Sequence, residues 1–170
     1  SLLLVVGKQY DHMVNDHPGY NPENLAYVYI GAVDSTGRAK LIEETQRLPE
    51  VDAITTCYNL PFWGASGNNV YLPGDDRELF NIADLYDVGN DYLNVLEIPI
   101  VEGQYFTENT TSSQEILVSR NFIEYMKPFA DWKDGAVGKT VQITGHDTKS
   151  ESMPLFTIRG VFEDFRLGSI

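Results

Sequence analysis

The sequence predicts an α+β fold with a larger first part and a smaller second part. Runs rich in β-branched and aromatic residues indicate strands, and runs with apolar residues at helical spacing indicate helices. Clusters of Gly, Pro and Asn separate these runs. In chain order the first part is predicted to be β-α-β-β-α, and the second part to add a strand, a helix and two further strands.

Length and composition indicate a folded globular protein. The chain has 170 residues, of which 42% are hydrophobic and 22% are charged, and a chain of this length buries roughly 70% of its extended surface. The formal net charge of -13 argues against nucleic-acid binding and against an anionic membrane surface, because both need a local excess of Lys and Arg. The acidity indicates either solubility or, as the alternative, a cationic ligand or a basic partner.

The single cysteine and the short apolar runs set further limits. Cys57 has no second cysteine to pair with, and its strand-like surroundings favour a small buried residue over a nucleophile. No run approaches the roughly 18 apolar residues of a membrane span. Residues 2–6 are apolar but too few for a secretory signal. They are interpreted as the tail of a removed span or as a short structured segment.

The first predicted elements are a stalk and a β-α-β unit. Residues 8–18 form a helix or stalk that ends in turn residues. Residues 25–33 are rich in β-branched and aromatic side chains and predict a buried strand, and residues 51–58 predict the next strand. Between the two, residues 34–37 supply caps for a helix over residues 38–48. One face of this helix is apolar and consists of Leu41, Ile42, Thr45 and Leu48.

A loop rich in Gly, Pro and Asn follows and carries the predicted contact surface. Residues 60–76 contain too many Gly, Pro and Asn residues to be regular throughout, yet they also contain large apolar side chains that are costly to expose. One interpretation is that these side chains fold back on their own part of the chain. The other is that they contact a partner protein. The candidate contact residues are Phe62, Trp63, Tyr71 and Leu72.

A strand, a short helix and a turn complete the first part. Residues 79–88 alternate in hydrophobicity and predict a strand. Residues 91–96 predict a helix with a polar cap at its start and a proline after its end. A glycine then allows a tight turn into the second part. The residues expected to cap, stop and turn the chain here are Asn90 or Asp91, Pro99 and Gly103.

The second part is predicted to contain three strands and one helix. Residues 115–119 form a short strand, and Ser119 caps the helix that follows it. Residues 138–144 alternate like an edge strand. Residues 155–162 are apolar on both faces, so this last strand is expected between neighbours. The apolar side chains of the helix fall at spacing i, i+1, i+4 and i+7 and are Phe122, Ile123, Met126 and Phe129.

The sequence contains no motif that predicts catalysis. Residues 138–140 lack the upstream glycine of a phosphate-binding loop. His12 and His17 lie beside carboxylates, but no His-x-x-x-His motif or cysteine pair supports a metal site. His146 beside Asp147 has the chemistry of a base, but no nucleophile elbow accompanies it. We therefore predict no catalytic, cofactor-binding or metal-binding residue, and no enzyme.

Four blocks of sequence stand in an order and spacing that a known family shares. They are residues 91–106, 115–121, 137–141 and 158–165. Together they resemble the MacB-like extracytoplasmic core domain of FtsX-type ABC transporter permeases. Residues 8–24 are similar to the stalk that follows the first membrane helix of such permeases, particularly those of Bacteroides-type bacteria.

The resemblance implies a layout, a location and partners. A stalk covers residues 1–24, a porter-like lobe covers residues 25–104 together with 154–170, and a smaller inserted lobe called Sabre covers residues 105–153. The domain would be the periplasmic part of an inner-membrane permease that forms a homodimer and pairs with a cytoplasmic ATPase. ATP hydrolysis would be coupled to periplasmic movement, called mechanotransmission. An exported substrate or periplasmic adaptor is expected to contact residues 60–74.

A second function in the same family stays open. Other FtsX-like relatives use this kind of domain as a periplasmic sensor that binds a peptide or controls a cell-wall hydrolase. Neither function requires a cofactor or nucleic acid, and neither needs chemistry performed by the domain itself. The resemblance therefore favours the transporter module first and the sensing domain second.

Overall fold

Three helices and six strands make up the part of the chain that the structure describes. This computed structural model describes residues 17–61, 63, 67–89, 91–107, 114–144 and 154–166. The helices are α2 (Ser35–Gln46), α3 (Tyr92–Val95) and α4 (Arg120–Met126). The strands are β1 (Gly67–Tyr71), β2 (Phe80–Asp84), β3 (Ile100–Gly103), β4 (Glu115–Ser119), β5 (Thr140–Thr144) and β6 (Leu155–Phe162). These elements confirm the α+β class.

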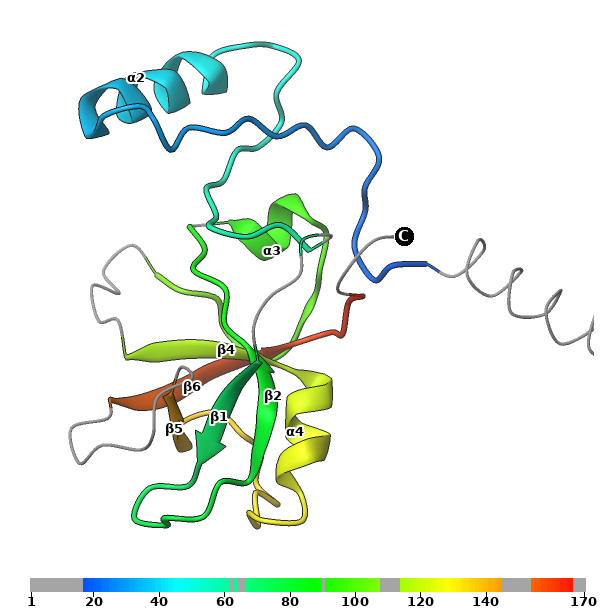
Figure 1. Cartoon of the computed structure of the whole chain (residues 1–170). Coiled ribbons are helices and arrows are strands. Elements are labelled where there is room, and N and C mark those ends of the chain that lie inside the picture. The colour runs from blue at the N-terminus through cyan, green and yellow to red at the C-terminus, as the bar shows by residue number, and fades with distance from the viewer. Residues whose placement is uncertain are drawn as a thin grey trace, which may run out of the picture.

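One mostly antiparallel sheet organises the molecule around β6 (Figure 1). Its strand order is β2-β1-β5-β6-β3, and β4 also pairs with β6. The pairing of β4 with β6 is parallel, whereas the other pairs are antiparallel. β6 has room for three partners because β5 pairs with its first half and β3 with its last residues. The prediction that the last strand lies between neighbours is confirmed.

The apolar residues of β6 explain its central place. Ile158 and Val161 are almost completely buried, and they pack with Val118 of β4 and with Ala136. Burying a large aliphatic side chain stabilises the fold by about 1.5–3 kcal/mol. A strand with neighbours on both edges and a covered face gains this stabilisation at several positions at once.

Helix α4 begins as the sequence predicts. The Ser119 hydroxyl oxygen accepts a hydrogen bond from the backbone N–H of Phe122 at 3.1 Å, which confirms the predicted cap. Met126 is completely buried against Val70 and other residues of the sheet. The helix ends at Met126, so Phe129 lies beyond it and is partly exposed, contrary to the predicted i+7 position on the same helix.

A second core surrounds α3 and holds both ends of the described chain. Tyr20 packs with the α3 residues and with Leu96, and the backbone N–H of Asn21 donates to the Leu96 carbonyl at 2.9 Å. The N–H of Arg166 donates to the Pro18 carbonyl at 2.7 Å. The entering and leaving segments therefore lie side by side next to α3.

The structure bears out the predicted start and stop of α3 only in part. Asp91 stands at the N-cap position but has a positive φ of 65°, and its side chain makes no cap hydrogen bond. Asn90 lies outside the described residues. The helix ends at Val95, before Pro99, because Glu97 adopts a left-handed conformation with φ 57°.

The predicted turn at Gly103 is confirmed. Gly103 has φ 73°, a conformation that L side chains rarely adopt, and it ends β3. A Cβ atom at this position would collide with the Arg159 carbonyl oxygen of the neighbouring β6. Only glycine lets the two backbones approach this closely.

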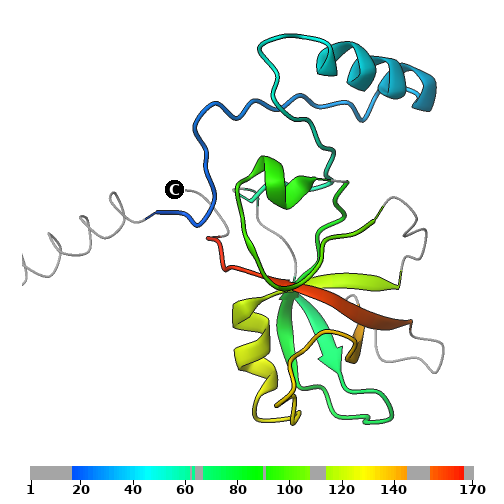
Figure 2. The ribbon, with the colours of Figure 1, turned by 180° about the vertical axis from the view of Figure 1, so that it is seen from behind.

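Two predicted strands do not form. Residues 25–33 and 51–56 are irregular, and Cys57 makes one isolated bridge to Val88. We call residues 26–55 the arm. None of its residues is buried, and Figures 1 and 2 show α2, which lies within it, standing apart from the sheet. Among the described residues no strand runs beside residues 25–33 or 51–55 to complete their hydrogen bonds, and pairing is confined to the contacts of Thr56, Cys57 and Tyr58 with residues 87–89.

Helix α2 itself is present, but it does not bury the face that its sequence suggests. The predicted helix over residues 38–48 is found at Ser35–Gln46, and the Asp34 carboxylate accepts the N–H of Gly37 at 2.7 Å. Leu41 and Leu48 are exposed, and Ile42 and Thr45 are only partly buried. Helical spacing identified the element without identifying what it packs against.

Residues 60–76 contain strand β1, which is compatible with the expectation that this stretch is not regular throughout. Three smaller corrections concern the sheet. The strand predicted over residues 79–88 is shorter, since β2 is Phe80–Asp84. β3 was not predicted, and β5 is an interior strand between β1 and β6 rather than an edge. The length of β2, the existence of β3 and the interior position of β5 all depend on pairing between distant segments. A local sequence pattern does not encode this pairing.

The predicted division into lobes stays a prediction. The sheet takes β1, β2, β3 and β6 from the predicted porter-like lobe and β4 and β5 from the predicted inserted lobe. The predicted stalk helix lies outside the described residues except for its last two positions. Within the described ranges no helix has the length and apolarity to cross a bilayer.

Candidate functional site

The structure separates the four predicted contact residues. Tyr71 is buried in β1, and Leu72 packs against the core that contains Val70. That core also contains Met126, Val141 and Ile143 of the second predicted part, so Leu72 packs beyond the part of the chain to which the loop was assigned. Trp63 is partly exposed, and Phe62 lies outside the described residues. Among the candidate residues that the structure describes, Trp63 is the most exposed.

Trp63 adjoins the exposed aromatic surface of the arm. Its ring meets the ring of Tyr27 edge to face, with the centroids 6.0 Å apart. Large apolar side chains continue along the arm and onto the segment that follows it. The exposed members are Tyr27, Val28, Tyr29, Leu41, Leu48 and Tyr58. Exposed apolar side chains that lie together, as Tyr27 and Trp63 do, are candidates for contact with another polypeptide.

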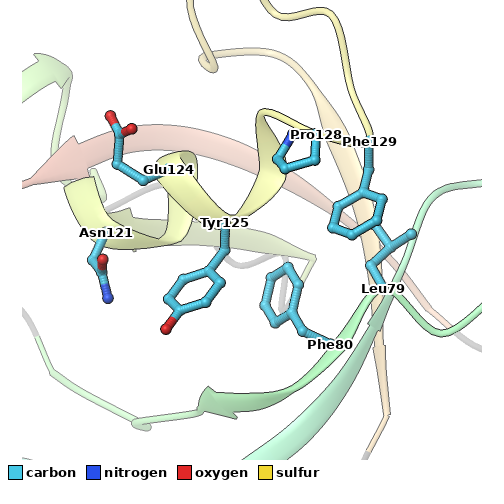
Figure 3. Close-up of a pocket in the computed structure, with 7 residues that line it drawn as sticks. All are labelled: Leu79, Phe80, Asn121, Glu124, Tyr125, Pro128 and Phe129. Atoms are coloured by element: carbon cyan, nitrogen blue, oxygen red, sulfur yellow. The ribbon is translucent and has the colours of Figure 1, made fainter.

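A groove on the sheet end of the molecule forms a second candidate surface (Figure 3). It has a volume of about 460 Å³ and lies between the start of β2 and the end of α4. Its lining residues are Leu79, Phe80, Asn121, Glu124, Tyr125, Pro128 and Phe129. Five of these seven residues are apolar or aromatic, so the floor of the groove is mainly hydrocarbon.

The aromatic rings give the groove a firm base. Phe80 contacts the ring of Phe122 at 5.6 Å and the ring of Tyr125 at 5.5 Å between centroids. Phe80 and Phe122 pack on the core that contains Met126, whereas Tyr125 and Phe129 are 44% and 43% exposed. The exposed rings therefore rest on side chains that the fold already holds in place.

Polar groups lie at one end of the groove. Figure 3 shows Asn121 and Glu124 toward the start of α4, and Leu79 and Phe129 at the opposite end. The Glu124 carboxylate accepts both its hydrogen bonds from Lys127, at 2.6 and 2.7 Å. The Asn121 backbone N–H donates to Asp164. A ligand in the groove would meet apolar surface at one end and polar surface at the other.

The whole sequence matches a known family model. The match covers residues 1–170, and the model describes the MacB-like periplasmic core domain. The chain belongs to this family.

One solved structure supports the fold of a MacB-like domain, and a second is similar over a smaller share of its length. The crystal structure of the periplasmic region of MacB from Actinobacillus actinomycetemcomitans is 19% identical, with a TM-score of 0.51 over 74% of this chain and 50% of that chain. A domain of a putative permease protein from Porphyromonas gingivalis is 20% identical, with a TM-score of 0.44 over 71% of this chain and 43% of that one. The chain spans about half the length of these structures. No curated protein matches.

A smaller hollow of about 270 Å³ lies beside α3 in this MacB-like domain. Part of its wall comes from Leu93, Ile98 and Tyr105, and the Tyr105 hydroxyl donates to the Gly89 carbonyl at 3.0 Å. Tyr105 is thereby tied to the chain before α3. The Tyr105 hydroxyl therefore already has a hydrogen-bond partner within the domain.

The buried titratable groups of the MacB-like domain favour neutral forms. Burial raises the pKa of the Cys57 thiol, which is partly buried against the α3 core, so the thiol is a weak nucleophile. Burial and the nearby Asp84 carboxylate raise the pKa of Tyr86 to about 12. Burial likewise raises the pKa of Tyr92 far above its usual range. These shifts follow from packing.

The described residues contain no group of three or more His, Cys, Asp or Glu side chains that could hold a metal ion. His17 uses its Nδ1 to accept the N–H of Gly19 at 3.1 Å. His12 and His146 lie outside the described residues.

The sequence did not predict the groove, because the positions of Phe129 and Tyr125 on the surface were not predicted. Phe129 was expected on the same face of α4 as Met126, and Tyr125 was not singled out. Pro128 is a signal that could have predicted the position of Phe129. A proline two residues after Met126 indicates the end of a helix, so Phe129 does not continue the helix face that contains Met126. The partnership with Phe80 depends on folding and has no local signal.

Proposed function

We propose that this MacB-like domain is the extracytoplasmic module of an FtsX-type ABC transporter permease. In this proposal the domain follows one membrane helix and precedes the next, on the periplasmic side of the inner membrane. The permease forms a homodimer and pairs with a cytoplasmic ATPase. ATP hydrolysis drives movement of the module, and the module catalyses no reaction itself.

The adjacency of Pro18 and Arg166 carries this proposal. A module inserted between two membrane helices must receive the chain and return it on the same side. The hydrogen bond from the Arg166 N–H to the Pro18 carbonyl holds the two passing segments together. The rings of Tyr20 and Phe165 also meet edge to face, 6.4 Å apart. This arrangement gives one compact point through which movement of membrane helices can enter the domain.

The exposed aromatic surface around Trp63 supports a partner on the periplasmic side. We propose that an adaptor or exported substrate contacts this surface when the module moves. Replacing Trp63 with Ala in the full permease should reduce transport while the isolated domain keeps its melting temperature. Normal transport by this variant would remove Trp63 from the contact surface.

Electron-spin distance measurements test the coupling directly. Asp134 is exposed and lies far along the chain from the entry point, so Asp134→Cys can carry a spin label in each protomer of the reconstituted permease. We expect a dipolar distance between protomers that changes when ATP is added. A hydrolysis-deficient ATPase should arrest the distance in the ATP-bound value. A distance that stays constant while ATP is hydrolysed would overturn the coupling, and no dipolar interaction at all would overturn the dimer.

A sensing role is the second candidate, and the groove between β2 and α4 favours it. A sensor needs a surface that binds a ligand, and the exposed Tyr125 and Phe129 rings provide one. In that case ligand binding would alter ATP hydrolysis without net movement of a substrate. Measuring ATPase activity and substrate movement in the same vesicles separates the two functions.

A further inference from the structure

The ring of Phe165 joins three segments that lie far apart in the sequence. It meets the rings of Tyr20 and Tyr86 edge to face, at 6.4 and 6.5 Å between centroids, and it stacks on Phe162 at 5.8 Å. Tyr20 lies near the beginning of the described chain, Tyr86 follows β2, and Phe162 ends β6. One side chain therefore holds the segment before the arm against the segment that leaves β6.

Two hydroxyl groups at this contact are buried without a partner. The side-chain oxygens of Tyr20 and Tyr86 are inaccessible to solvent, and neither makes a hydrogen bond within the part of the chain that the structure describes. The hydroxyl of Tyr105, which packs against the same core as Tyr20, instead donates to the Gly89 carbonyl. A buried hydroxyl without a partner has lost its hydrogen bonds to water and gained none. The two hydroxyls therefore oppose the contact that the rings favour.

Two backbone hydrogen bonds form where these segments meet. The N–H of Arg166 donates to the Pro18 carbonyl at 2.7 Å, and the N–H of Asn21 donates to the Leu96 carbonyl at 2.9 Å. Figures 1 and 2 show the two segments, in blue and in red, passing beside each other. The amides of Arg166 and Asn21 therefore report whether the contact is closed.

We propose that this contact is a latch with two states. In the closed state, which the structure shows, the Phe165 ring lies against Tyr20 and Tyr86. In the open state the ring leaves them, water reaches both hydroxyls, and the hydrogen bond between Arg166 and Pro18 is broken. Burial of the rings favours the closed state, and hydration of the hydroxyls favours the open state. The two states consequently lie closer in free energy than rings without hydroxyls would allow.

The latch deepens the proposed function and rests on it for its role in the permease. A closed latch makes the two segments move together, so that movement of the membrane helices reaches the sheet, and an open latch disconnects them. The same turn also contacts α4. The Asp164 carboxylate accepts the N–H of Asn121 at 2.7 Å, and Glu163 pairs with Arg120 at 3.1 Å. A change at the latch is therefore passed to α4 as well.

Hydrogen exchange of the protein of the full 170 residues, followed by NMR, tests the latch without the permease. We expect the amides of Arg166 and Asn21 to have matching protection factors, at least about 10-fold below that of the Ile158 amide in β6. Tyr20→Phe and Tyr86→Phe should each raise the protection of both latch amides by about 10-fold, because the unpartnered hydroxyl no longer favours opening.

Two further variants serve as the control and as the opposite change. Tyr58→Phe is the matched control, since the Tyr58 side chain is 78% exposed, and it should leave the protection of the latch amides unchanged. Gly19→Ala should lower that protection at least about 10-fold. Gly19 has φ 82°, and a Cβ atom there would lie 2.5 Å from the Asp164 carbonyl oxygen of the facing segment. Protection of the Ile158 amide shows that the sheet of each variant is intact.

Three results of the exchange measurement would overturn the latch. Equal protection of the Arg166, Asn21 and Ile158 amides would show that the contact opens only when the whole domain unfolds. Unchanged protection in both Tyr→Phe variants would show that opening does not hydrate the hydroxyls. Lower protection in these variants would show that the hydroxyls have a partner, such as a bound water molecule.

The reconstituted permease tests the role of the latch in transmission. Gly19→Ala should leave ATP hydrolysis in place and reduce the ATP-dependent change in the distance measured at Asp134. A change as large as in the unmodified permease would overturn this role. A distance that is constant in the unmodified permease would overturn the proposed function instead, and it would not affect the exchange results. The two proposals therefore fail separately.

Discussion

Two apolar segments of this protein, residues 25–33 at the start of the arm and β6, differ in the structure that they form. Both are rich in residues that favour strands. β6 pairs with three strands, and its Ile158 is completely buried. Residues 25–33 form no strand, and Tyr29 is 81% exposed. The comparison teaches that strand propensity becomes a strand only where another segment completes the hydrogen bonds and covers a face.

The two longer helices show the same contrast. α4 has only seven residues, but its Met126 is buried and Ser119 caps it. α2 has twelve residues and no buried side chain, and a helix of that length is marginal by itself. Local interactions stabilise α2, namely the Asp34 cap and the ion pairs of Arg47 with Glu43 and Glu44. Exposed pairs of this kind contribute only about 0.3–0.5 kcal/mol each.

Hydrogen exchange should show the largest difference between the two regions. The amides of Val28, Tyr29 and Ile30 should exchange nearly as fast as in an unfolded peptide, because they lie in an exposed, irregular segment. The Ile158 amide, which donates to the Lys139 carbonyl at 2.9 Å, should exchange at least about 1,000-fold more slowly. Mass spectrometry or NMR measures both rates. Strong protection of the arm amides would show that these residues pair in solution and would break the comparison.

The next largest effect is expected from deleting core methyl groups. Ile158→Ala should lower the free energy of unfolding by about 2–5 kcal/mol, since it leaves a cavity beside Val118 and Val161. Leu41→Ala on α2 should change it by less than about 0.5 kcal/mol, because Leu41 is exposed. Urea titration followed by circular dichroism measures both values. A large loss for Leu41→Ala would mean that α2 is packed against another surface.

A smaller effect should separate a structural carboxylate from a surface carboxylate. One Glu102 oxygen accepts the backbone N–H groups of Ala136 and Val137, at 2.9 and 3.1 Å. Glu102→Ala leaves these donors without that partner and should destabilise the protein by about 1–3 kcal/mol. Glu43→Ala removes an exposed ion pair of α2 and should cost at most about 0.5 kcal/mol. The same urea titration compares them, and equal losses would contradict the structural role of Glu102.

The most gradual effect concerns alkaline pH. The pKa of Tyr86 is raised to about 12 in the folded protein, above its value of about 10 in an unfolded chain. Between these pH values the unfolded chain loses the Tyr86 proton while the folded protein keeps it. The resulting stability is therefore fully present below about pH 10 and is lost as pH rises toward 12. Urea midpoints across this range should fall, and they should fall less in Tyr86→Phe.

The sequence predicted what local chemistry controls and missed what distant contacts control. β4, α4 with its Ser119 cap, and β6 follow from periodicity and capping. β3 and the interior place of β5 depend on pairing with β6 and β1, which no local pattern encodes. For the candidate site, aromatic composition pointed to Trp63. The groove was missed because Phe80 and Phe129 come together only after folding.

The position of β6 has a mechanical consequence. A load that enters where Arg166 is joined to Pro18 reaches the C-terminal end of β6 directly. At that end β6 is paired on one edge with β3 and on the other with β4. Tension along the strand axis then stretches both rows of hydrogen bonds in shear, so that they share the load and do not open one by one. β6 can thus carry tension from the chain ends into the sheet without unzipping.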